Sequence, residues 1–319
     1  MRPVRVLLTG ATGFIGSRVL HRLRELQAGG TPLGLHTAGR APIPGVDWRR
    51  ADLADVGSLE DVVRDVDVLV HLASRVSGDE AVCRVVNHLS TEALMAQAVA
   101  SGVRRIVHLS TTAVYGPGPH GGPGIDEIAP SPVSPASRTR LEGEKATLAS
   151  GGTVLRPGLI TGAGDRWVVP ALDELLGQVP ARWNGGRGLM SMVDVGDLAR
   201  LIVALIVAPG VIPTGAHHAS HPAPVRNADL MAELSELDIL PAALPEWSWQ
   251  QCLEQLRSRP GGVSERQFAL LAGDHWYRDT GIWEAARCPA GPGPLRRLTA
   301  AAPWYRSHLT SRRVAALSA

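Results

Sequence analysis

The 319-residue sequence predicts an α/β protein with a doubly wound parallel sheet and a smaller C-terminal lobe. The first observation is a run of leucines and β-branched residues, 4–9, typical of a central strand buried on both faces. The second is the glycine-rich turn that follows it, with a helical pattern of apolar residues behind. The third is the return of similar apolar runs at 67–74, 104–116 and 154–165. Strand runs that alternate with helical patterns indicate βα units, so we expect the strands to be parallel.

The turn after the first strand has the sequence GATGFIG, residues 10–16. Gly10 permits a tight turn, Gly13 lets the backbone approach a pyrophosphate, and Gly16 lets the helix pack closely on the strand. Between a strand and a helix, this spacing strongly indicates a Rossmann-type fold that binds a dinucleotide. The cofactor-binding residues expected in this segment are Gly10, Thr12, Gly13, Phe14, Ile15 and Gly16.

The end of the second strand, expected near Ala38, indicates which dinucleotide binds. NAD enzymes with this fold carry an acidic residue there, which accepts a hydrogen bond from the ribose 2′-hydroxyl. This sequence has no acid at that point, and Arg40 is placed to meet a 2′-phosphate, with Arg18 as a second candidate. The alternative is that Arg40 is a solvated loop residue. The sequence therefore favours NADP(H), with NAD(H) as the second choice.

The composition and charge argue against several functional classes. The net charge is only +2, so nucleic acid is not an expected partner. The longest apolar run, 198–212, contains an arginine and is too short to span a membrane. The first strand begins too early to leave room for a signal peptide, and three cysteines without pairing or metal spacing fit a reducing cytoplasm. His217, His218 and His221 are expected to be strand or surface residues, with no metal bound.

Two later segments resemble the active site of the extended short-chain dehydrogenase/reductase family. HLSTTAVYG, residues 108–116, resembles its active-site strand, and Leu141 and Glu144 match the end of its catalytic helix motif. In that family a Tyr-x-x-x-Lys pair comes just before this leucine. Here Arg140 stands in the lysine position and Ala136 in the tyrosine position. The resemblance therefore implies the scaffold of a hydride-transfer enzyme without its usual proton donor.

The resemblance covers residues 4 to about 235 and implies further roles. Thr111 takes the place of the residue that hydrogen-bonds the reacting carbonyl, and Asp52 that of the residue that binds the adenine amine. Asn87 and Thr91 would brace strand ends, while Asp194 and Asp197 would cap or brace a helix. Other cofactor contacts that it implies are Leu53, Leu72, Ala73, Ser74, Pro157 and Gly158.

The expected organisation is an NADP(H)-binding domain over residues 1–165, with later returns near 190–220, and a substrate-binding lobe over 166–319. The proline- and glycine-rich segment 117–135 is expected to form a mobile wall of the pocket. Seven of the eight tryptophans follow residue 160. One or two of them lining a flat, apolar pocket would suit a polycyclic aromatic substrate.

A family member without the Tyr/Lys pair resembles the atypical ketoreductases that tailor angucyclinones in antibiotic biosynthesis. The resemblance implies NAD(P)H-dependent reduction of a carbonyl on a polycyclic aromatic polyketide. Hydride addition to a quinone-like or vinylogous ketone leaves a phenolate or enolate, whose conjugate acid has a pKa nearer 10 than that of an alcohol. A neighbouring phenol can also hydrogen-bond the same oxygen. We therefore favour a substrate-assisted mechanism that needs no tyrosine.

Two alternatives stay open at this point. One is a catalytically inactive NADP(H)-sensing protein that regulates a partner. The other is a reductase whose acid has moved to Ser137, His120 or Tyr115. A deep apolar pocket beside the nicotinamide would favour an enzyme, whereas a shallow or filled pocket would favour the sensor.

Overall fold

Seven parallel strands form the central sheet, in the spatial order β12-β7-β5-β4-β1-β2-β3. The computed structural model describes residues 2–242, 244–259 and 262–317. The strands of the sheet are β1 Val4–Thr9, β2 Leu33–Gly39, β3 Asp47–Arg50, β4 Val68–His71, β5 Arg105–Leu109, β7 Thr153–Arg156 and β12 Gly215–His218. The direction of winding reverses between β1 and β4, where such sheets open a ligand crevice at the carboxyl ends of the strands. The predicted doubly wound sheet is confirmed.

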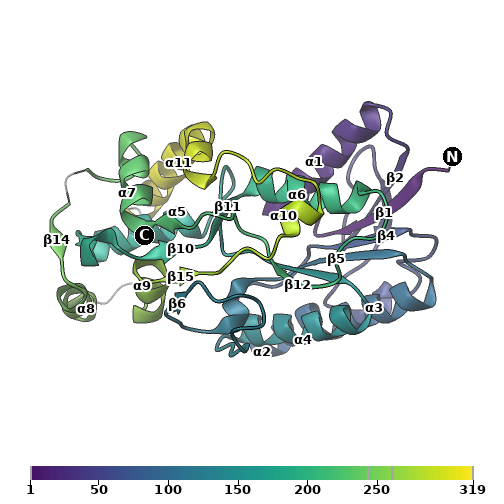
Figure 1. The fold of residues 1–319 in the computed structure, drawn as a ribbon, viewed down its shortest axis with the longest axis horizontal. Coiled ribbons are helices and arrows are strands. Elements are labelled where there is room, and N and C mark those ends of the chain that lie inside the picture. The colour runs from purple at the N-terminus through teal and green to yellow at the C-terminus, as the bar shows by residue number, and fades with distance from the viewer. Residues whose placement is uncertain (1, 243, 260–261, 318–319) are drawn as a thin grey trace.

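Helices cover both faces of this sheet (Figure 1). On one face α1 packs against α6, and on the other α3 packs against α4. The helices of this lobe are α1 Phe14–Ala28, α2 Glu80–Arg84, α3 Ser90–Ala100, α4 Pro135–Ala149, α6 Val195–Val207 and α10 Ile282–Ala285, with a π-helical turn at Val85–Leu89 and 3-10 turns at Val56–Leu59 and Thr112–Tyr115. The predicted apolar stripe of α1 is buried at Val19, Leu20 and Leu23. Its burial against the sheet explains why this helix forms at that place.

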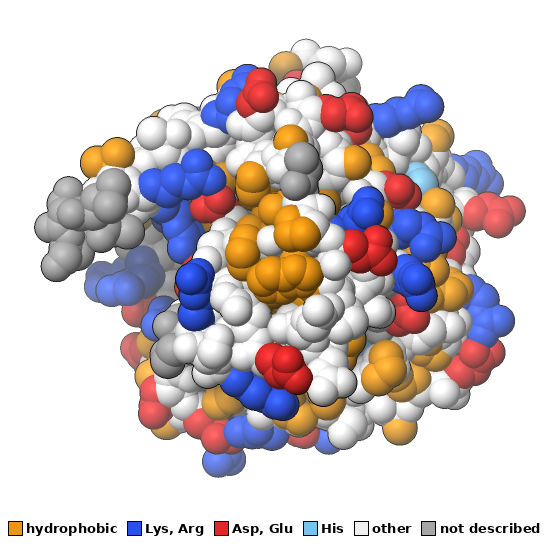
Figure 2. All heavy atoms as spheres, turned by 90° about the vertical axis from the view of Figure 1, so that its left-hand side faces the viewer, with side chains coloured by type: hydrophobic (Ala, Val, Ile, Leu, Met, Phe, Trp, Pro, Cys, Tyr) orange, Lys and Arg blue, Asp and Glu red, His pale blue; other side chains and the backbone are white. Residues whose placement is uncertain are grey.

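A second lobe is built around a four-stranded sheet in the order β13-β10-β15-β6. Its elements are β6 His120–Gly121, β10 Leu189–Met190, β13 Val225–Arg226, β15 His275–Trp276, α5 Val168–Gln178, α7 Asn227–Glu236, α8 Trp249–Ser258, α9 Glu265–Ala272 and α11 Pro294–Leu317, with a 3-10 turn at Asn184–Gly186. Two strand pairs complete it: β8 Leu159–Thr161 with β11 Met192–Asp194, and β9 Arg182–Trp183 with β14 Glu246–Trp247. Trp183 and Phe268 are fully buried in its core. Figure 2 shows one end of the molecule, where blue and red side chains are interspersed around an apolar patch.

The chain returns from the second lobe to the first. Ile282, Trp283 and Cys288 are buried in the same core as the central sheet and α6. The 117–135 segment, expected to be a loop throughout, holds a short strand, and its predicted mobility stays a prediction. It contains β6, which pairs with β15, and the Ser131 amide donates to the Val114 carbonyl. Pairing between positions so far apart in the chain leaves no local pattern, so the sequence did not reveal this strand.

Candidate active site and cofactor cleft

The glycine turn has the close packing that its spacing predicts. Gly10 adopts a φ of 71°, and a Cβ there would lie 2.7 Å from the Ala73 nitrogen. A Cβ on Gly16 would lie 2.0 Å from the Gly10 carbonyl oxygen. No side chain caps the N-terminus of α1 at Gly13. This helix end therefore presents backbone amides that suit a pyrophosphate.

A cavity of ≈ 460 Å³ opens at the ends of β1, β2 and β4. Predicted cofactor residues that line it are Gly10, Thr12, Arg40, Asp52, Leu53, Ala73 and Ser74. Thr37 lines it as well, and its buried hydroxyl has no hydrogen-bond partner among the described residues. An unpaired buried hydroxyl is costly, so this cavity fits a ligand with polar groups, such as an adenosine. Sequence reasoning missed Thr37, because a threonine near a strand end carries no distinguishing signal.

Arg40 and Asp52 form an ion pair at the mouth of this cavity, with 3.3 Å between Nε and Oδ2. The Arg40 side chain is 83% exposed, which leaves it free to turn toward a ligand. Arg18 lies elsewhere: it donates to the Ala163 carbonyl across 3.0 Å and lines a hollow with Gly13. The expectation that Arg18 helps Arg40 is therefore wrong. Its side chain extends from α1 toward the segment after β8, on the pyrophosphate side.

That second hollow, of ≈ 520 Å³, lies beside the glycine turn. Gly13 and Phe14 line it together with Trp167 and Trp304. Trp167 is 63% exposed, whereas Trp183 and Trp283 are buried in the two cores. Trp167 and Trp304 therefore lie beside the glycine turn.

The remaining predicted cofactor residues do not line either of these two hollows. Ile15 and Gly16 are in the first turn of α1, and Leu72 is buried in the core of the sheet. Pro157 and Gly158 were expected to contact the carboxamide with their backbone. The Pro157 carbonyl accepts from the Thr112 amide at 3.0 Å, and the Gly158 amide donates to Ser220 Oγ at 2.9 Å, while the expected contact with a carboxamide stays a prediction. These two backbone groups hold the strand ends together.

Thr111 follows β5 and caps the 3-10 turn behind it. Its Oγ1 accepts from the Ala113 amide at 3.1 Å. This contact uses a lone pair and leaves the hydroxyl proton available to a ligand. The geometry is consistent with the predicted donor to a carbonyl oxygen.

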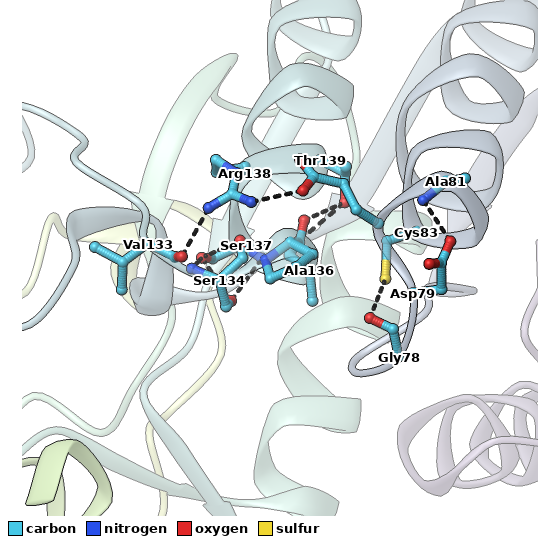
Figure 3. A network of polar contacts seen from close by, with 12 residues as sticks. Gly78, Asp79, Ala81, Cys83, Val133, Ser134, Ala136, Ser137, Arg138 and Thr139 are labelled. Carbon is cyan, nitrogen blue, oxygen red and sulfur yellow. Dashed lines mark hydrogen bonds and ion pairs between the residues drawn. The ribbon is translucent and has the colours of Figure 1, made fainter.

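Ala136 and Arg140 lie one turn apart on α4. Ala136 is 9% exposed, and Figure 3 shows it beside the cap formed by Ser134 and Ser137. Arg140 Nη2 donates to the Leu109 carbonyl at 3.1 Å, and its Nε has no partner in the described part of the chain. Burial lowers the pKa of Arg140 to about 10, so the group stays cationic at neutral pH. The structure thus holds a positive charge at the end of β5.

Glu144 acts on this charge only through space, where it raises the pKa of Arg140, and its ion pair is with Arg156. It is fully buried and binds Arg156 through both carboxylate oxygens: Nε lies 3.2 Å from Oε1 and 3.1 Å from Oε2, and Nη2 lies 2.5 Å from Oε2. A buried pair of this kind satisfies both of its charges. Arg140 is therefore held without a carboxylate of its own among the recorded ion pairs.

Two of the three candidates for a moved acid are committed elsewhere. Ser137 Oγ belongs to the capping box of α4, where it bonds the Ser134 amide and Oγ. Tyr115 accepts from Arg156 Nη1 at 2.9 Å and contacts His218 Nε2 at 2.8 Å. His218 Nδ1 faces the Arg278 carbonyl, so that nitrogen carries the proton and Nε2 must accept from Tyr115. The Tyr115 proton is therefore already donated.

The implied bracing roles are seen in the structure. Asn87 bonds both the amide and the carbonyl of Arg75, and Thr91 Oγ1 bonds His71 Nε2 at 3.0 Å. Asp194 accepts from two amides in the first turn of α6. Asp197 is buried and pairs with Arg200 and Arg297. These groups hold the scaffold and leave the cleft free.

In residues 2–242, 244–259 and 262–317, no group of three or more His, Cys, Asp and Glu side chains is placed to hold a metal ion. No helix there is both long enough and apolar enough to cross a bilayer. The three cysteines are free and buried.

Comparison with known proteins places the fold. The model of the NAD dependent epimerase/dehydratase family matches residues 6–217. The chain is similar over 96% of its length to a UDP-glucose 4-epimerase structure from Thermotoga maritima, with a TM-score of 0.73 and 18% identity, covering 100% of that chain. At this identity the likeness concerns the fold.

Three curated relatives are similar in sequence. A 2-alkyl-3-oxoalkanoate reductase of Stenotrophomonas maltophilia is 27% identical, over 84% of each chain. A 4-hydroxy-2-methyl-3-oxo-4-farnesyl-3,4-dihydroquinoline-1-oxide ketoreductase of Stigmatella aurantiaca is 28% identical, over 65% of this chain and 66% of the relative. A dTDP-glucose 4,6-dehydratase of Streptomyces antibioticus is 31% identical over 46% of this chain, which spans about half of that relative.

Proposed function

The chain belongs to the NAD dependent epimerase/dehydratase family, and we propose that it is an NADP(H)-preferring ketoreductase of polycyclic aromatic ketones. The observation that carries the proposal is the pairing of an intact dinucleotide cleft with Ala136 and Arg140 at the end of β5. The residues at the cofactor end suit a nicotinamide dinucleotide. The proton chemistry differs from that of the family, because a methyl group and a guanidinium occupy the positions of Tyr and Lys.

The cofactor would be held mainly by the first lobe. The amides at the start of α1 suit its pyrophosphate, Thr37 and Asp52 the adenosine, and Arg40 a 2′-phosphate. When bound, the cofactor supplies hydride to the carbonyl carbon of the substrate. The NADP(H) preference rests on Arg40 and on the absence of an acid at the end of β2.

The protein's own residues would stabilise charge on the reacting oxygen. Thr111 donates a hydrogen bond, and the Arg140 cation lowers the free energy of a developing negative charge nearby. Arg140 keeps its proton at neutral pH, so it stabilises charge without acting as the acid. A hydroxyl on the substrate, adjacent to the ketone, then supplies the proton.

Two observations support a flat, hydroxylated aromatic substrate. Position 136 carries only the methyl group of an alanine where the resemblance expects the phenol ring of a tyrosine. The Stigmatella relative is named for reducing a ketone on a dihydroquinoline ring system. An angucyclinone-like polyketide in an antibiotic pathway combines these features, and the second lobe would bind it.

The test is NADPH oxidation against a panel of polycyclic ketones and quinones, with product analysis. Activity on ketones that carry an adjacent hydroxyl supports the proposal. NADPH binding without turnover of any member would favour the catalytically inactive sensor. The double variant Ala136→Tyr with Arg140→Lys is expected to be no faster on the hydroxylated ketone, because the new ring fills substrate volume. A large gain in kcat would contradict substrate assistance.

A further inference from the structure

A cluster of phenol and imidazole rings lies where the end of β5 meets the small sheet of the second lobe. Tyr115 comes from the 3-10 turn after β5, His120 from β6, and His275 and Tyr277 from β15 and the residue behind it. Tyr115 and Tyr277 stack at 5.0 Å between ring centroids. Four side chains that can carry or accept a proton therefore gather in a largely buried place.

The Tyr115 side of the cluster is closed to proton transfer. Its proton goes to His218, whose other nitrogen is fixed on the Arg278 carbonyl. Arg156 holds the Tyr115 oxygen from the other side. The Tyr115 proton and the His218 proton are each bound to one acceptor in these contacts. We therefore assign Tyr115 a structural role.

The Tyr277 side is open at both ends. The Tyr277 hydroxyl contacts His120 Nδ1 at 2.7 Å. Burial raises the pKa of Tyr277, and the neighbouring Thr112 hydroxyl opposes this rise. Thr112 directly follows Thr111, and both are partly exposed at the strand end. His120 is also partly exposed, so the imidazole can exchange protons with water.

The contacts of the neighbouring imidazole leave His120 free to change tautomer. His275 lies 5.4 Å from it in an edge-on arrangement, and its Nε2 faces the Pro117 carbonyl at 3.3 Å. Nε2 must therefore carry the His275 proton. The His120 ring is bonded by Tyr277 at Nδ1, and burial lowers its pKa, so it is neutral at pH 7. A neutral imidazole with one nitrogen toward a phenol can pass a proton in either direction.

We propose that His120 and Tyr277 form a proton relay that opens at Thr112 and returns a proton to the substrate during ketone reduction. The relay rests on the proposed function, which it deepens by naming where the proton enters. His120 and Tyr277 are positioning residues in this scheme, because they act through the Thr112 hydroxyl.

The step balances as follows. The carbonyl carbon gains a C–H bond, its oxygen takes the proton of the adjacent substrate hydroxyl, and that hydroxyl is left as a phenolate. The phenolate takes a proton from the Thr112 hydroxyl, which in turn takes one from the Tyr277 hydroxyl. Tyr277 is reprotonated by His120 Nδ1, and His120 takes a proton from water at Nε2. One ketone, one reduced cofactor and one proton thus give one alcohol and one oxidised cofactor.

The experiment compares Tyr277→Phe and His120→Gln with wild type, using NADPH and a peri-hydroxytetralone. We expect each variant to lower kcat about tenfold, since a positioned proton donor contributes roughly 10² to 10⁴ and water replaces part of it. The solvent isotope effect on kcat should shrink, and the pH profile should lose the limb that His120 controls. Tyr115, His275 and Tyr277 face His120, and Arg156 lies behind Tyr115, but burial of the imidazole is what lowers the pKa of His120.

Tyr115→Phe is the matched control, because it removes a phenol from the same cluster. It should lower thermal stability while leaving the pH profile and the isotope effect of wild type. If Tyr277→Phe keeps the kcat and pH profile of wild type, the relay is refuted and the ketoreductase stands. If wild type oxidises NADPH with neither the hydroxytetralone nor any panel ketone, both proposals fail together.

Discussion

The two halves of the cleft are built by different means. The adenosine half is shaped by backbone: Gly10 and Gly16 leave no room for a Cβ, and the start of α1 offers amides. The half that we propose to be catalytic is shaped by side chains from separate elements, with Thr111 after β5, Arg140 on α4 and Tyr277 after β15. A backbone cradle depends on local glycine spacing, whereas a proton path depends on which distant side chains meet. The first half has the glycine spacing of a Rossmann turn, and the second half carries Ala136 and Arg140, on which the proposed function rests.

The largest effect is expected from breaking the backbone half. Gly16→Ala would place a methyl group 2.0 Å from the Gly10 carbonyl oxygen. The helix must move away, so NADPH binding should be lost and the free energy of unfolding should fall by about 1–3 kcal/mol. Isothermal titration and urea denaturation measure the two effects. Gly177→Ala is the control: nothing lies within 4 Å of its added methyl, and a small gain in stability is expected. Unchanged NADPH affinity in Gly16→Ala would contradict the close approach.

The histidines near the catalytic half predict a dependence of stability on pH. Burial lowers the pKa of His71 and of His218 to about 4, against about 6.5 when the chain is unfolded. Between these values the unfolded chain binds more protons, so stability falls as the pH drops below about 6.5. The slope is about 1.4 kcal/mol per pH unit for each histidine. Burial raises the pKa of Asp165 and Asp194, whose contribution has the opposite sign.

Urea denaturation at pH 7 and pH 5 measures this loss, and His218→Gln should make the difference between the two values smaller. An equal pH slope for the variant and wild type would mean that His218 is not held neutral by the fold.

Thr111→Val tests the catalytic half directly. We expect kcat/KM to fall by about 1–2 kcal/mol, roughly 5- to 30-fold, because the substrate hydroxyl shares the stabilisation of charge. Blocking that hydroxyl as a methyl ether should cost more than the Thr111 change. Steady-state rates for the free phenol and its ether, in both proteins, make the comparison. Equal rates for phenol and ether would remove the support for substrate assistance.

The smallest effect on cofactor binding is expected from a change at Arg40, at the mouth of the adenosine cavity. Arg40→Ala should weaken NADPH binding by about 1 kcal/mol, close to fivefold, because the side chain is exposed and already paired with Asp52. Binding of NADH should not weaken, and the loss should shrink at high salt. Arg18→Ala is the control and should act equally on both cofactors. Equal NADPH and NADH affinities in wild type would contradict the preference.

The sequence determined the local parts of this protein. The run at 4–9, the glycine turn and the stripe on α1 are short-range patterns, and each becomes the predicted strand, turn or helix. Residues in such patterns depend on neighbours a few positions away. The same reason explains why Asp194 and Asp197 were correctly placed at the start of a helix.

The tertiary structure decided the contacts between distant positions. Asp52 pairs with Arg40 at the mouth of the cavity, and the phenol of Tyr115 meets an imidazole 103 positions away. His120 and Tyr277 are 157 positions apart, and only the pairing of β6 with β15 brings them together. Whether a hydroxyl can act as an acid or a base depends on which acceptor its proton is already hydrogen-bonded to. That depends on partners from other elements, so the pattern around Tyr115 or His120 could not show which of them stays free.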